Sequence, residues 1–273
     1  MDYSYIREAL NKDLFNNFVL SIQLEPDGFS FYITHKESIY KPLYFSSRKF
    51  EKSGIGSLIH ELKQFHEFDN DPFHKTLIIY HTSRFCMIPD ELFNPEQLMD
   101  YFRLSHPISD DEIILTSDIQ LINSKVLYGV HNGLITFLKT KFPEAFLIHS
   151  ACPAINYGMK KSGKTCLITH YEKSISIAVF DMSALKLFNI YKVHDIHDLV
   201  YYIFNSLKSC NQEISETVFH FTGIAEKDSD KKNVLARYIS KPVYYKPELM
   251  EVYEPGFPST ILFNHLEGLN CVL

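Results

Sequence analysis

The fold is decided by residues 165–209, which read TCLITHYEKSISIAVFDMSALKLFNIYKVHDIHDLVYYIFNSLKS. Apolar residues that recur at short spacing between tight turns predict three strands, at 166–170, 175–180 and 185–191. Apolar residues at helical spacing then predict a helix from Asp195 to about Ser209, with Asp195 as its N-cap. The stretch is therefore expected to be a three-strand meander followed by a helix.

The same order of elements recurs near the N-terminus. Strands are predicted at 18–24, 29–34 and 39–45, and a helix at 55–68. The first two strands are separated by Glu25-Pro26-Asp27-Gly28, in which Pro presets φ and Asp-Gly accepts a left-handed conformation. This repeat predicts an α/β protein of two lobes, with mixed sheets flanked by helices.

The rest of the chain supplies shorter elements. Residues 83–123 contain three prolines and an acidic run, and we interpret them as an insertion in the first lobe. Further strands are predicted at 77–80, 145–149, 217–221 and 242–245. Further helices are predicted at 125–142, 152–159, 230–239 and 257–266.

Composition excludes several classes of protein. The net charge of −6 argues against a nucleic-acid surface, which needs clustered Lys and Arg. The five cysteines are odd in number and form no Cys-x-x-Cys pair, which favours free thiols in a reducing compartment. The polar N-terminus and the lack of a long apolar run predict a cytoplasmic protein without membrane insertion.

One segment formally matches a phosphate-binding loop, namely Gly158-Met-Lys-Lys-Ser-Gly163-Lys164-Thr165. A working loop of this kind follows a strand and opens into a helix, whose N-terminus helps to hold the phosphates. Here the predicted order is reversed, with a helix before the match and a strand after it. We therefore interpret the segment as a basic linker.

No catalytic residue and no metal site is predicted. His194 and His197 are three residues apart at a helix start, and His60 and His66 share one predicted helix, but neither pair has a third ligand beside it. The nucleophile pattern G-x-S-x-G is absent from the sequence. The tyrosines around 244–245 and 253 fit either a core or an exposed partner surface.

The doubled arrangement of three strands and a helix resembles the actin-like ATPase superfamily, which includes actin, the heat-shock chaperone ATPase domains and sugar kinases. It is most similar to pilus-assembly and cell-division members, and to an uncharacterised bacteroidetal family with this fold. The resemblance implies two actin-like lobes, at 1–161 and 162–273. It also implies ATP with Mg²⁺ held between them by two phosphate hairpins.

The residues at the implied cleft depart from that pattern. Where the family has an Asp before a glycine-rich turn in the first hairpin, this sequence has Gln23, followed by Leu24-Glu25-Pro26. In place of the Asp and glycines of the second hairpin it has His170, followed by Tyr171-Glu172-Lys173-Ser174. The adenosine motif keeps only Gly223. The vestigial cleft candidates are Gln23, Glu25, His170, Glu172, Lys173 and Gly223.

These departures predict a protein that has kept the fold and lost the chemistry. Glycine turns let backbone N–H groups approach phosphate, whereas bulky or acidic side chains oppose a polyanion. We expect a non-catalytic binding or scaffolding protein that uses no cofactor and engages a protein partner or itself. The alternative is an atypical ATPase or kinase-like enzyme that binds ATP with Mg²⁺ through Lys173 or Lys164, and a small-molecule binder is a third reading.

Overall fold

The computed structural model describes residues 3–6, 12–50, 54–64, 73–224, 233–239, 242–247 and 259–273. Contacts within the chain define two compact units, Met1–Cys152 with Gly268–Leu273, and Pro153–Glu267. Two helices, α4 (Ala151–Met159) and α7 (Phe263–Val272), therefore change unit along their length. The predicted lobes, 1–161 and 162–273, stay a prediction, because compact units need not coincide with the lobes of a fold.

The main sheet of the first unit is built on the predicted N-terminal meander. Its strands follow the order β1-β4-β3-β2-β5-β9, with β2, β3 and β4 antiparallel and β5 and β9 parallel to β2. The bounds are β1 (Tyr3–Ile6), β2 (Phe18–Glu25), β3 (Gly28–His35), β4 (Ser38–Lys49), β5 (Lys75–Tyr80) and β9 (Phe146–His149). The strands predicted over these residues are confirmed.

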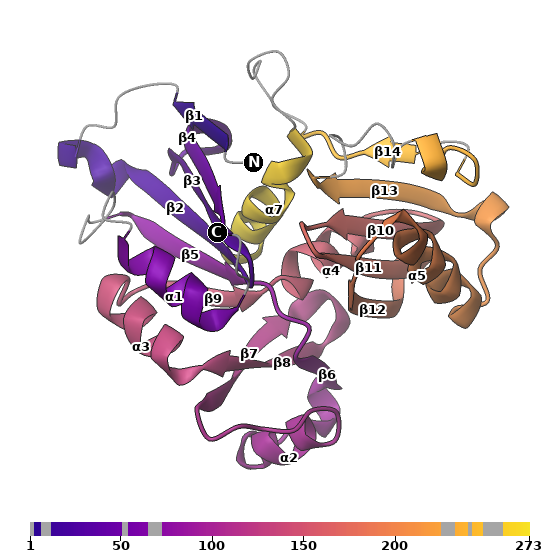
Figure 1. The fold of residues 1–273 in the computed structure, drawn as a ribbon, viewed down its shortest axis with the longest axis horizontal. Helices are drawn as coiled ribbons and strands as arrows, with labels where there is room; N and C mark the ends of the chain where they lie inside the picture. The colour runs from indigo at the N-terminus through magenta and orange to yellow at the C-terminus, as the bar shows by residue number, and fades with distance from the viewer. Residues whose placement is uncertain are drawn as a thin grey trace. The chain divides into compact units, whose positions relative to one another are not determined.

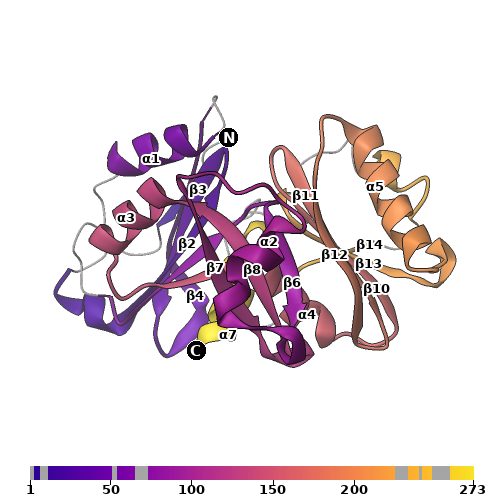
Figure 2. The same ribbon diagram turned by 90° about the horizontal axis from the view of Figure 1, so that it is seen from below.

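Helices cover both faces of this sheet. On one face, α1 (Ile55–Gln64) and α3 (Asn132–Lys141) lie side by side (Figures 1 and 2). On the other face, Gly268 of α7 lies against β5, where an added Cβ would come within 2.7 Å of Ile79 and 3.1 Å of Leu77. The glycine is needed there because α7 approaches the strand closely.

The predicted insertion, residues 83–123, supplies β6, β7 and a short helix α2 (Leu98–Arg103). Its two strands pair with β8, which lies beyond the predicted end of the insertion, in a small sheet of the order β6-β8-β7. The strands of this sheet are β6 (Phe85–Pro89), β7 (Glu112–Ile119) and β8 (Ser124–His131). The helix predicted at 125–142 is wrong over its first seven residues, which belong to β8. The central strand, β8, is buried continuously over residues 126–130. Its Leu127 and Val130 continue the helical spacing of Leu134 and Leu138 in α3, which made one long helix fit the sequence.

The second unit contains the stretch that decided the fold. Its sheet has the order β12-β11-β10-β13-β14, in which β10, β11 and β12 form the predicted meander and β13 runs parallel to β10. The bounds are β10 (Lys164–His170), β11 (Ser174–Asp181), β12 (Ala184–Lys192), β13 (Val218–Gly223) and β14 (Pro242–Tyr244). All of these strands are confirmed.

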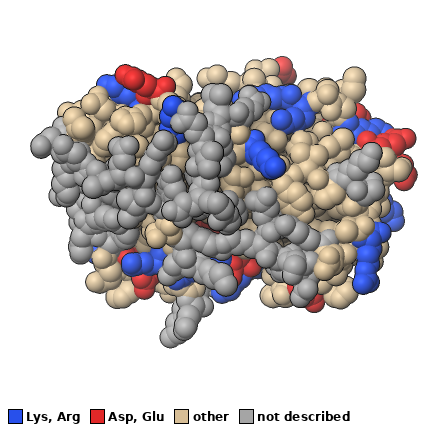
Figure 3. Space-filling view, turned by 90° about the horizontal axis from the view of Figure 1, so that it is seen from above, with Lys and Arg blue, Asp and Glu red and all other residues tan. Residues whose placement is uncertain are grey.

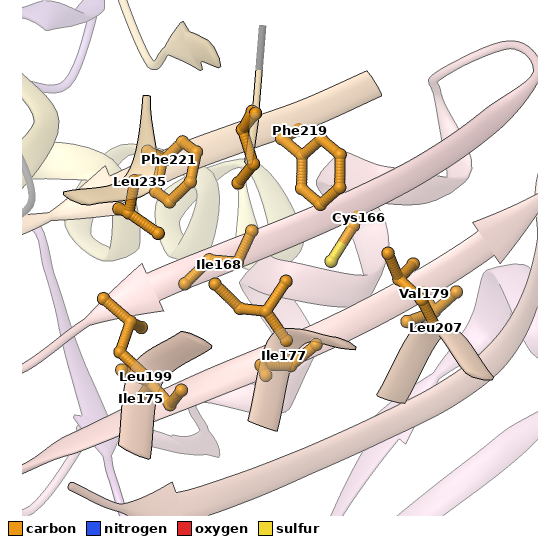
Figure 4. Packing of buried hydrophobic residues seen from close by; sticks show 12 residues of the cluster. Cys166, Ile168, Ile175, Ile177, Val179, Leu199, Leu207, Phe219, Phe221 and Leu235 are labelled. Carbon is orange, nitrogen blue, oxygen red and sulfur yellow. The ribbon is translucent and has the colours of Figure 1, made fainter. Parts of the chain in front are cut away.

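The helix after the meander, α5 (Ile196–Ser209), is also confirmed with its cap. The Asp195 carboxylate accepts hydrogen bonds from the backbone N–H groups of His197 (2.7 Å) and Asp198 (3.0 Å). Its apolar stripe covers one face of the sheet and forms the core shown in Figure 4, where side chains of β10, β11 and β13 meet those of α5. On the opposite face α4 approaches so closely that a Cβ on Gly158 would lie 2.1 Å from the Phe180 ring.

Two predictions near the C-terminus are corrected. The last helix begins at Phe263, after a 3-10 turn at Ser259–Leu262, and it continues to Val272, past the predicted end at 266. Residues 257–258 of the predicted helix lie outside the described residues. The predicted end at 266 was too early. Gly268 is a poor helix former, but its packing on β5 lets the helix continue past it. Tyr245, one candidate for an exposed partner surface, is buried and donates a hydrogen bond to Glu267 (2.9 Å).

Some predictions fall on undescribed residues. Part of the helix at 55–68, part of that at 230–239 and Tyr253 lie outside the described residues.

Candidate functional site

The first predicted phosphate hairpin is the connection between β2 and β3. Glu25 pairs with Gly28, so Pro26 and Asp27 are its two turn residues. The Gln23 side chain is buried on β2, and its amide donates a hydrogen bond to the Glu25 carboxylate. Gln23 and Glu25 are thus brought together, and the position that would carry a metal-organising carboxylate holds a neutral amide.

The back of this turn is closely packed. The carbonyl of Asp27 accepts a hydrogen bond from the Phe50 backbone (3.1 Å), and that of Pro26 accepts one from Gly54 (2.6 Å). A Cβ on Gly28 would lie 2.7 Å from the Arg48 carbonyl oxygen. The glycine of this turn is therefore explained by the approach of β4.

The second predicted phosphate hairpin connects β10 to β11. The Tyr171 N–H donates to the Ser174 carbonyl (2.9 Å), which closes the turn, and the Lys173 carbonyl accepts from Val193 N–H (3.0 Å). Glu172 and Lys173 are exposed at its tip. The Tyr171 ring is buried, and its hydroxyl accepts a hydrogen bond from the Asn264 amide (3.0 Å). The turn is thus held by a bulky side chain where the fold family has glycine.

Gly223 lies beside His170, because these two residues are partners in the parallel pairing of β10 with β13. Its φ is +74°, and a Cβ there would lie 2.2 Å from the His170 carbonyl oxygen. Both features require glycine. Of the six cleft candidates, the second unit therefore brings His170 and Gly223 into direct contact, with Glu172 and Lys173 on the adjoining turn.

The formal phosphate-loop match has the reversed context that the sequence predicted. Gly158 belongs to α4, Gly163 lies in a turn with φ +76°, and Lys164 and Thr165 begin strand β10. The Lys164 ammonium forms an ion pair with Glu216, and that hydrogen bond raises the pKa of the lysine. With a helix before it and a strand after it, the segment has no helix N-terminus to offer a phosphate.

A buried polar cluster that the sequence analysis missed lies where β5 and β9 end. His81 Nδ1 is 2.9 Å from Ser150 Oγ, and His149 Nε2 is 2.9 Å from the Thr82 carbonyl. Burial lowers the pKa of His81 to about 3 and that of His149 to about 4. Both imidazoles are therefore neutral at pH 7.

The cluster continues into the small sheet. The Ser117 hydroxyl of β7 accepts a hydrogen bond from the backbone N–H of His149 (3.2 Å) and donates one to the Tyr128 hydroxyl (3.2 Å). The Tyr128 hydroxyl in turn donates to the Leu147 carbonyl (3.3 Å). Burial also raises the pKa of the nearby Cys152 thiol. A protonated thiol is a poor nucleophile, and imidazoles with such low pKa values are poor bases, so the cluster is unsuited to catalysis. Its hydrogen bonds serve instead to join β9 to β7 of the small sheet. Polar residues that directly follow two parallel strands were the signal that could have revealed it.

In the part of the chain that the structure describes, no three His, Cys, Asp or Glu side chains gather to hold a metal ion. None of its described helices is long and apolar enough to cross a membrane. Among the residues not drawn in grey, Figure 3 shows both signs of charge interspersed on one face.

Comparison with known proteins identifies the fold. A family model described as "Protein of unknown function (DUF3822)" matches residues 8–241. A solved structure from Bacteroides thetaiotaomicron, of a protein with actin-like ATPase fold and unknown function, is similar with a TM-score of 0.76 and 21% identity, covering 97% of this chain and 100% of that one. The chain therefore has an actin-like ATPase fold, as its sequence predicted.

A second solved structure is more distant. The PilM-PilN type IV pilus biogenesis complex matches with a TM-score of 0.53 and 9% identity, covering 93% of this chain and 98% of that one. The search of curated proteins found no significant match. At these identities the likeness concerns the fold alone.

Proposed function

The chain belongs to the DUF3822 family of proteins of unknown function, and from this premise we propose that it is a non-catalytic binding or scaffolding protein on an actin-like fold. The proposal rests on the chemistry of the two hairpin turns, because the fold alone does not assign an activity. The PilM-PilN structure is one case in which a protein of this fold takes part in a complex.

The observation that carries the proposal is the first turn. A phosphate-binding turn needs backbone N–H groups that an anion can reach. Pro26 has no N–H, and Asp27 beside it is buried and carries a carboxylate. Glu25 adds a second carboxylate at the same turn, held by the Gln23 amide. Two acidic side chains and a proline make this turn unfavourable for a polyphosphate.

The second turn supports the same conclusion. Its Tyr171 N–H is used to close the turn on Ser174, and Glu172 contributes negative charge. Phosphoryl transfer depends mainly on positioning and on metal electrostatics, both of which need these turns. Lys173 is the cation on which the rival hypothesis, an atypical ATPase, depends.

The test is thermal unfolding of the whole chain with and without millimolar Mg²⁺-ATP, with sodium sulfate of equal ionic strength as the control. A ligand at 100 times its dissociation constant stabilises a protein by about 2.7 kcal/mol. For domains of 150 residues or more, each kcal/mol moves the midpoint by about 2–4 °C. We expect the midpoint with Mg²⁺-ATP to equal that with sulfate.

A rise of several degrees with Mg²⁺-ATP alone would overturn the argument from the two turns and favour the atypical ATPase. The Lys173→Ala variant then identifies the site, because the ATPase hypothesis predicts that it loses the rise. Phosphate release measured on the same samples separates binding from turnover.

A further inference from the structure

A groove in the second unit lies at the start of β13, away from both hairpin turns. It has a volume of about 700 Å³ and is lined by the 3-10 turn Ile214–Glu216, the first residues of β13, Tyr238, Ile239 and Val243 of β14. Phe219 and Ile239, which are buried, form its floor. All of these residues belong to the same unit, so the groove is a feature of that unit alone.

The walls of the groove combine polar residues with four apolar side chains that are accessible to solvent. Ile214, Val218, Tyr238 and Val243 are exposed by 37%, 44%, 51% and 41%. The Tyr238 ring is held edge-on against Phe204 of α5, with ring centroids 5.3 Å apart. Single exposed apolar residues are ordinary, but four around one concavity are typical of a binding surface.

The rim of the groove is acidic. Among the described residues, two carboxylates, Glu213 and Glu216, line the groove, and a nearby cation, Lys164, forms its ion pair with Glu216. Within the described residues, the Glu213 side chain has no hydrogen bond and no ion pair. This excess of negative charge beside apolar side chains is complementary to a ligand that combines apolar groups with Lys or Arg.

The position of the groove indicates how a peptide ligand would bind. It lies at the edge of the sheet, since β14 is the last strand in the order β12-β11-β10-β13-β14. Addition of a further strand is disfavoured, because β14 has three residues and begins with Pro242, which has no N–H to donate. A groove of this volume holds a few side chains, as in the recognition of a short amphipathic segment.

We propose that this groove binds a short segment of a partner protein in which large apolar side chains are flanked by Lys or Arg. The apolar side chains pack against Val218 and Tyr238, and the cation pairs with Glu213. This inference rests on the proposed binding function and names the class of partner.

The test is selection from a library of displayed random 12-residue peptides on the immobilised full-length chain. We expect enriched peptides to combine Leu, Ile, Phe or Trp with Lys or Arg. The enriched peptide with the highest affinity is then titrated by fluorescence polarisation against the wild type, Val218→Lys and Glu213→Lys. Met182→Asn is the matched control, because Met182 is 78% exposed in the same unit and lies in a left-handed turn that Asn accepts.

The expected result is a loss of at least about tenfold in affinity for Val218→Lys and for Glu213→Lys, and no change for Met182→Asn. A selection repeated on Glu213→Lys is expected to favour Asp and Glu in place of Lys and Arg, which a merely misfolded variant would not do. Failure to enrich any peptide, or equal binding to all variants, would overturn the inference. The ATP measurement has a separate readout, so the inference can fail while the proposed function stands.

Discussion

Gly223 offers the sharpest test of how the second unit is built, through the substitution Gly223→Ala. Two separate costs are expected. A residue other than glycine in the left-handed region, here at φ +74°, costs about 1–3 kcal/mol. The new Cβ would also lie 2.2 Å from the His170 carbonyl oxygen, which belongs to a strand paired on both sides. Such overpacking costs about 1–3 kcal/mol more.

Gly163→Ala is the matched control. Gly163 has φ +76°, almost the same as Gly223, but nothing lies within 4 Å of the position of its Cβ. This variant therefore has the cost of the backbone conformation without the contact. In both variants alanine restricts the unfolded chain, which offsets about 0.4–1 kcal/mol and cancels in the comparison. The difference between the two losses of stability isolates the contact with His170 and is expected to be about 1–3 kcal/mol.

The assay is urea unfolding of both variants followed by far-ultraviolet circular dichroism, because the chain contains no tryptophan. The free energies are obtained by linear extrapolation to zero denaturant. If the two variants lose the same stability within about 0.5 kcal/mol, the close approach of β13 to His170 is refuted. Gly223 would then be a glycine for conformational reasons only.

Two further predictions concern stability. Burial lowers the pKa of His149 to about 4 in the folded chain, whereas the pKa of an unfolded histidine is about 6.5. Between these two pH values the unfolded chain binds more protons than the folded chain, so this histidine lowers the stability of the fold as the pH falls from about 6.5 towards 4. The His149→Gln variant is therefore expected to lose less stability than the wild type between pH 7 and 5 in urea titrations, by up to about 1.4 kcal/mol per pH unit. Identical slopes of unfolding free energy against pH for the two proteins would contradict this. Asp195→Ala should lower the unfolding free energy by about 0.5–2 kcal/mol through loss of the α5 cap, whereas Asp195→Asn should cost little; equal losses would show that the cap oxygen is unimportant.

Much of the fold was predictable from local patterns. The meander at 166–191 and its N-terminal counterpart were visible because apolar residues mark the buried faces of each strand. The start of α5 was visible because Asp195 offers a side-chain oxygen to backbone N–H groups that have no partner within the helix. The repetition of these elements indicated an actin-like fold, and this likeness is confirmed by the solved structure from Bacteroides.

The site was less predictable, because its properties depend on neighbours from distant parts of the chain. Gln23 and Glu25 could be placed on one hairpin from sequence, but the contact of His170 with Gly223 depends on the parallel pairing of β10 with β13. The neutrality of His81 and His149 depends on burial beneath other elements. No local pattern reports how much water a side chain will lose.

The sequence by itself thus determined which segments are strands or helices wherever one face is apolar and the other polar, since that period is a local property. Tertiary structure alone decided that residues 124–131 form a central strand, because Leu127 and Val130 continue the helical spacing of Leu134 and Leu138 in the helix that follows. It also decided that α7 continues through Gly268, where packing on β5 outweighs helix propensity. The groove at β13 arises in the same way, from residues that meet only after the sheet of the second unit has formed.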